Sequence, residues 1–110
     1  MPPVRLRAYV PIWRRPWMAL GEPTYGSSLL RMVGVANVVT EAPYPEIGPS
    51  EAAERRPDLV LAPSEPYPFG ERHQAELRRA APVRFVDGQD LFWWGARTRA
   101  ALDRLRDTLS

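Results

Sequence analysis

Cysteine is absent from the 110-residue chain, which excludes a disulfide framework and any metal site built on thiolates. Lysine is absent as well, so all fifteen basic residues are arginine, and thirteen acidic residues leave a net charge of +2. That charge is too small to predict a nucleic-acid partner. The chain also lacks a run of about 20 apolar residues, so no membrane insertion is expected. No signal peptide is visible, and the sequence as given predicts a cytoplasmic location.

Residue patterns typical of catalysis are also scarce. The chain has no serine in a nucleophile elbow, no metal-ligand spacing and no phosphate-binding loop. The one histidine, His73, falls on a predicted helix, where we expect a solvated or packed residue rather than a base. Ser64 with Glu65, or Asp87 with Asp90, could form acid–base pairs, but no partner base supports them. The sequence therefore predicts a protein that is not an enzyme and holds neither a metal nor a covalent cofactor.

What the chain does contain is a regular alternation of short strands and helices. Strands are predicted at 6–12, 35–39, 59–62 and 83–86, and helices at 25–33, 50–56, 71–80 and 98–109. Thr24 and Thr98 are typical helix caps, and Gly34 is a typical helix stop. Such alternation indicates a largely parallel sheet with helices on both faces. We predict a single α/β domain over residues 1–110: a Rossmann-like, three-layer α/β/α sandwich with four strands.

Aromatic residues gather in the four loops that follow the predicted strands, which hold eight of the eleven rings. Ligands of open parallel sheets bind beyond the carboxyl ends of the strands. Rings held between prolines suit a large, flat, partly apolar ligand, and arginine can add contacts to carboxylate or phosphate groups. The candidate ligand-binding residues are Trp13, Arg14, Trp17, Tyr44, Glu65, Tyr67, Asp90, Phe92, Trp93, Trp94 and Arg97.

Packing is the competing interpretation of these rings. Trp93 and Trp94 are adjacent, so one ring is expected to be buried and the other displayed, and Trp13 and Trp17 present a similar choice. Arginine pairs on the helices, such as Arg55 with Arg56, are expected on solvated faces.

The order of the motifs resembles a known family. The segments that carry the likeness are Val10–Met18, Thr24–Leu30, Gly34–Val38, Tyr44–Ile47 with Arg56–Leu61, and Ser64–Phe69 with Asp87–Gly95. Together they resemble the C-terminal lobe of helical-backbone, class III periplasmic solute-binding proteins, which deliver vitamin B12 or ferric siderophores to ABC importers. Proteins of this family have two α/β lobes joined by a long helix, with the ligand between them. The resemblance implies that this chain holds the second lobe.

The resemblance also implies a function and partners. We expect a ligand-binding lobe for cobalamin or a ferric chelate, with an ABC permease or a separate N-terminal lobe as partner, at a periplasmic or cell-surface location. Tyr44 corresponds to an aromatic residue that faces the corrinoid, and Asp90 to the loop that reaches the ligand. A family glutamate docks on permease arginines; Ser50 aligns with it, and Glu51 is next to it. The alternative is a stand-alone interaction or homodimerisation module without transport activity.

Overall fold

A parallel sheet forms the centre of the protein in the computed structural model, which describes residues 2–92 and 98–109. The strands are β1 (Leu6–Tyr9), β4 (Val35–Asn37), β5 (Leu59–Pro63) and β6 (Val83–Val86). They lie in the order β4-β1-β5-β6, and each neighbouring pair is parallel. The predicted four-stranded parallel sheet is therefore confirmed.

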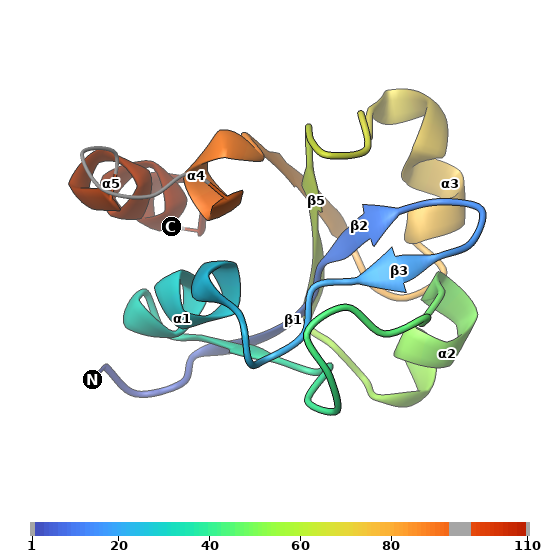
Figure 1. Ribbon diagram of the computed structural model, residues 1–110, viewed down its shortest axis with the longest axis horizontal. Helices are drawn as coiled ribbons and strands as arrows, with labels where there is room; N and C mark the ends of the chain where they lie inside the picture. Colours follow the sequence, from blue (N-terminus) through green and yellow to red (C-terminus); the bar gives the residue numbers. More distant parts are fainter. Residues whose placement is uncertain (1, 93–97, 110) are drawn as a thin grey trace.

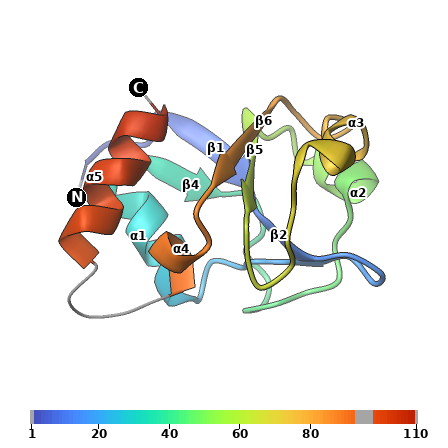
Figure 2. The same cartoon turned by 90° about the horizontal axis from the view of Figure 1, so that it is seen from above.

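Helices cover both faces of this sheet and complete the predicted three layers (Figure 1). One face carries α1 (Tyr25–Met32), α4 (Gln89–Phe92) and α5 (Thr98–Leu109). The other carries α2 (Pro49–Glu54), the 3₁₀ turn η1 (Glu71–His73) and α3 (Gln74–Leu77). Figure 2 shows the same two groups of helices on opposite sides of the strands. None of the described helices is long and apolar enough to cross a bilayer.

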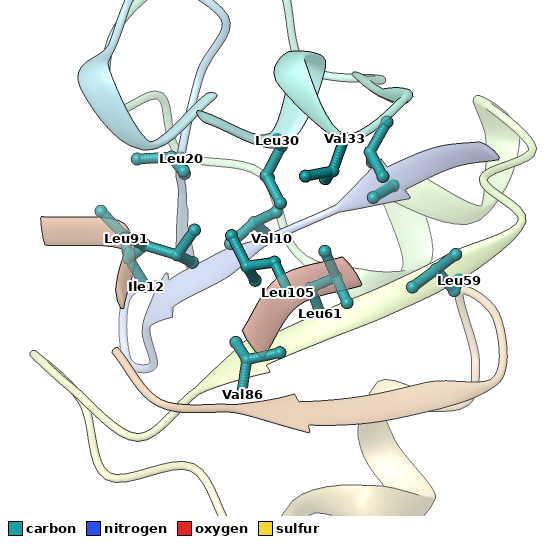
Figure 3. Close-up of a cluster of buried hydrophobic side chains, with 12 residues drawn as sticks. Val10, Ile12, Leu20, Leu30, Val33, Leu59, Leu61, Val86, Leu91 and Leu105 are labelled. Atoms are coloured by element: carbon teal, nitrogen blue, oxygen red, sulfur yellow. The ribbon is translucent and has the colours of Figure 1, made fainter. Parts of the chain in front are cut away.

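The apolar core is divided by the sheet into two clusters. Leu61 of β5 packs with Leu30 of α1 and Leu105 of α5 on one face (Figure 3). Val60, the preceding residue of β5, packs with Leu77 of α3 on the other face. All five residues of β5 are buried, because a central strand covered on both sides alternates between two cores rather than between core and water.

The ends of α1 lie where the sequence predicts them, at a capping side chain and at a glycine. The Thr24 hydroxyl accepts a hydrogen bond from the Ser27 N–H at 3.2 Å, as predicted for a helix cap. Gly34 has a φ of +87°, the left-handed conformation that stops α1 and favours glycine. α5 begins at Thr98, and the predicted cap contact of its side chain lies outside what the structure describes.

Three segments differ from the prediction. The strand expected at 6–12 ends at Tyr9, and the chain then forms an antiparallel hairpin of β2 (Pro11–Trp13) and β3 (Met18–Ala19). A run that is apolar apart from Arg7 could not show that its second half joins another sheet. The helix expected at 71–80 is broken into η1 and α3. The loop expected at 87–96 contains α4, whose first turn is capped because the Asp87 carboxylate accepts the Gln89 N–H at 2.9 Å.

Candidate functional site

The β2–β3 hairpin carries Trp13 and Trp17 past the carboxyl end of β1. Backbone hydrogen bonds fasten the segment around Tyr44 to this hairpin: the Ala19 N–H donates to the Pro45 carbonyl at 3.0 Å, and the Gly21 N–H donates to the Pro43 carbonyl at 2.7 Å. The structure therefore brings the hairpin and the 43–45 segment together, as predicted for loops at one edge of a parallel sheet.

Five rings form what we call the aromatic cluster: Trp13, Trp17, Tyr67, Phe69 and His73. Trp13 meets Tyr67 edge to face at a centroid distance of 5.4 Å, and Trp17 stacks on Phe69 at 6.0 Å. Tyr67 and Phe69 lie 4.6 Å apart, and both contact His73. Offset and edge contacts of this kind are favourable arrangements for ring pairs. Two sequence-predicted loops are thus joined by direct ring contacts.

The aromatic cluster has a buried base and an exposed top. Phe69 and His73 are both 6% exposed, whereas Trp13 is 43% exposed and the nearby Tyr44 is 52% exposed. Trp17 and Tyr67 are half-buried between these extremes. Packing therefore describes the base of the cluster, and display at the surface describes its top.

An ion pair braces the cluster from the side of α3. The Arg14 Nε donates to the Glu76 Oε1 at 2.7 Å, and the Arg14 guanidinium lies 5.9 Å from the centroid of the Trp17 ring. The hydrogen bond from Arg14 lowers the pKa of Glu76 and raises that of Arg14. Arg14 was predicted to contact a ligand, and in the structure it fastens the hairpin to α3.

His73 organises the base of the cluster. Its Nδ1 accepts the Gly70 N–H at 3.1 Å, so the neutral ring carries its proton on Nε2. Burial lowers the pKa of His73, and the charges of Arg72 and Arg14 lower it further. His73 was expected to be a solvated or packed helix residue, and it is packed at 6% exposure. Its position three residues after Gly70, at the end of an aromatic loop, was the signal that could have indicated this turn.

The loops after β5 and β6 are fastened together by hydrogen bonds and by a close backbone contact. The Gly88 N–H donates to the Ser64 hydroxyl at 3.0 Å, and a Cβ at Gly88 would lie 2.4 Å from the Glu65 carbonyl oxygen. Only glycine fits this contact. Glu65 is half-buried at this junction, so the structure places it beside the candidate site without showing a role for its carboxylate.

Asp90, another predicted ligand contact, is engaged inside the protein. It is 3% exposed, and its carboxylate accepts bonds from the Arg104 Nε at 2.8 and 3.0 Å. This pair fastens α4 to α5, and a direct contact between Asp90 and a ligand stays a prediction. Trp93, Trp94, Arg97 and the side chain of Phe92 lie outside what the structure describes.

The proposed permease contacts lie behind the cluster, on α2. Ser50 and Glu51 are exposed and border a hollow of about 270 Å³, which is lined by Trp17, Gly48, Pro49, Ser50, Glu51, Glu76 and Arg79. Glu51 lies 3.7 Å from Arg55. Of the arginine pair expected on a solvated face, Arg56 is exposed, whereas Arg55 is half-buried because it also bonds Glu41 at 2.7 Å and the Val38 carbonyl at 3.1 Å. Across the described residues, no three His, Cys, Asp or Glu side chains could together hold a metal ion.

Solved structures provide the comparison with known proteins. No family model and no curated protein matches the chain. The periplasmic vitamin B12 binding protein of Vibrio cholerae matches 96% of this chain with a TM-score of 0.74 and 19% identity. A periplasmic heme-binding protein of Pseudomonas aeruginosa matches 94% with 0.73 and 22%, and a possible iron-binding protein of Staphylococcus epidermidis matches 96% with 0.77 and 15%.

The chain has the fold of one lobe of a periplasmic solute-binding protein. It spans 44% of the Vibrio cholerae protein, 42% of the Pseudomonas aeruginosa protein and 45% of the Staphylococcus epidermidis protein, which is less than half of each. The predicted resemblance to a single lobe of such proteins is thereby confirmed for the fold. By their names these neighbours are binding proteins.

Proposed function

We propose that this solute-binding lobe holds cobalamin or a ferric chelate against the exposed top of the aromatic cluster and Tyr44. The observation that carries the proposal is a pair of exposed rings at the carboxyl edge of the sheet: Trp13, which contacts Tyr67 of the aromatic cluster, and Tyr44, in the segment that is hydrogen-bonded to the hairpin. A flat chelate can lie on such rings and keep its polar rim in water. The names of the structural neighbours, which include vitamin B12, heme and iron binding, support the same ligand class.

A second lobe would cover the other side of the ligand in this proposal. The chain spans less than half of its neighbours, so it supplies one wall of a cleft. One wall buries less of the ligand than two, and we expect weaker binding by this lobe than by a complete cleft. Ser50 and Glu51 on α2 are the proposed contacts for a permease.

The test is a titration of the chain with cyanocobalamin, hemin and a ferric siderophore, followed by calorimetry. We expect one of these to bind, and we expect Trp13→Ala to weaken that binding by about 3- to 10-fold, which corresponds to the loss of one ring contact. Phe85→Ala is the matched control, because Phe85 is an exposed ring (37%) outside the aromatic cluster. Binding that is absent for all three ligands, or equal loss in the two variants, would contradict the proposal.

A further inference from the structure

Strand β4 ends the sheet with unused backbone groups. The Gly34 carbonyl accepts from the Leu6 N–H, and the Val38 N–H donates to the Ala8 carbonyl, so the even-numbered residues face β1. Because backbone groups alternate along a strand, the N–H and C=O of Val35 and of Asn37 point away from the sheet. No residue that the structure describes bonds these four groups. The edge is therefore open to pairing with another strand.

A hollow of about 270 Å³ lies along this edge, between β4 and the flank of α1. It is lined by Glu22, Ser27, Ser28, Arg31, Val35, Ala36 and Asn37. Ser27 and Ser28 are small, so this flank of α1 leaves space beside the strand. Two exposed large hydrophobic residues belong to the segments around the amino end of β4. Met32 ends α1, two residues before Gly34, and Val4 precedes Arg5, whose N–H donates to the Gly34 carbonyl.

The two charged residues of the hollow lie toward opposite ends of β4. The Glu22 N–H donates to the Val39 carbonyl, just past the carboxyl end of the strand. The Arg31 carbonyl accepts from the Gly34 N–H, just before the amino end. Among the described residues the Glu22 carboxylate has no partner. The Arg31 guanidinium bonds the Pro2 carbonyl and retains further donors.

We propose that the occupant of this edge is a second copy of the chain, with its β4 antiparallel to the first about a two-fold axis. Reversal of the strand places Glu22 of each copy beside Arg31 of the other, so the edge is complementary to itself. With Ala36 at the axis, Val35 of each copy faces Asn37 of the other, and all the outward groups are paired in four hydrogen bonds. The two sheets then form one continuous sheet of eight strands.

The test is the mass of the chain in solution, measured by sedimentation equilibrium over a concentration series. We expect a species of twice 12.5 kDa that dissociates on dilution and is weakened by high salt. Glu22→Arg is expected to weaken the dimer about tenfold or more, because it brings like charges together twice across the axis. The double variant Glu22→Arg/Arg31→Glu should restore it. Glu22 is exposed, so its substitution leaves the fold intact.

Amide hydrogen exchange supplies a second, local measurement. The N–H groups of Val35 and Asn37 should exchange fast in dilute protein and slowly at concentrations where the dimer forms. A monomer at every concentration would overturn the proposal. So would a dimer that survives Glu22→Arg but is lost in Trp13→Ala, because that result places the second copy on the aromatic cluster.

Discussion

His73 is the residue whose chemistry most affects the aromatic cluster. Its neutral Nδ1 accepts the Gly70 N–H, and its ring contacts Tyr67 and Phe69. Protonation of Nδ1 would place its new N–H against the Gly70 N–H. It would also add a buried positive charge close to Arg72 and Arg14, and Glu76 offsets this repulsion only in part. The imidazole is therefore a position where acid should loosen the base of the site.

Stability should fall as the pH drops below the ordinary histidine pKa of 6.5. The pKa of His73 is lowered in the folded protein, so the unfolded chain takes up the proton first, and the free energy of unfolding declines from 6.5 down to the folded-state pKa. His73→Gln should remove this part of the pH dependence. Because His73 is the one histidine, its NMR signal reports the pKa directly.

Two arginine substitutions serve as matched controls for that titration. Arg72→Gln should raise the pKa of His73, because the charge of Arg72 is one cause of its lowering, whereas Arg78→Gln should leave it unchanged. A folded-state pKa at or above 6.5 would contradict the prediction.

At the scale of elements, close backbone contacts join the loops that form the site. The loop after β5 and the residues leading into α4 meet at Gly88, where a Cβ would lie within 2.7 Å of three Glu65 atoms. Both segments are connecting loops without regular secondary structure of their own. Their relative position therefore depends on this contact and on the bond from the Gly88 N–H to Ser64.

Gly88→Ala should lower the free energy of unfolding by about 1–3 kcal/mol, because the added methyl group forces the two loops apart. Gly70→Ala is the control: its Cβ would meet nothing within 4 Å, so a change near zero is expected. Urea unfolding of both variants measures the difference. Equal effects in the two variants would show that the contact with Glu65 does not set the cost.

The alternation of strands and helices was predictable because it depends on local periodicity and on caps such as Thr24. The hairpin was not, because the run from Leu6 to Ile12 is apolar apart from Arg7 and a local pattern cannot assign its halves to different sheets. At the site, the sequence predicted which loops carry the rings. It could not predict that Arg14 pairs with Glu76, 62 residues away, or that Asp90 pairs with Arg104, since long side chains find such partners only in the folded protein.

At the scale of the whole molecule, the two apolar cores share one sheet. Ala8 and Leu61 contribute to the core beneath α1 and α5, while their neighbours Tyr9 and Val60 contribute to the core beneath α2 and α3. The Tyr9 hydroxyl also donates to the Ile47 carbonyl at 2.8 Å, which fastens the sheet to the segment before α2. Loss of either core would expose the same strands.

We therefore expect the chain to unfold as a single unit. Urea unfolding followed by tryptophan fluorescence, to which Trp13 and Trp17 of the aromatic cluster contribute, should coincide with unfolding followed by far-ultraviolet circular dichroism, which reports the helices. Separate midpoints would contradict the prediction of one domain over residues 1–110.

The hydrogen bonds from Ala19 and Gly21 to the prolines on either side of Tyr44 have a kinetic consequence. Pro45 and Pro43 have fixed φ angles, and their carbonyls already accept hydrogen bonds from the hairpin. This part of the backbone therefore loses little conformational entropy when a ligand binds. A ligand that arrives at Tyr44 meets a surface whose main chain is already in place. Encounter, rather than rearrangement of this segment, should then set how quickly the complex forms.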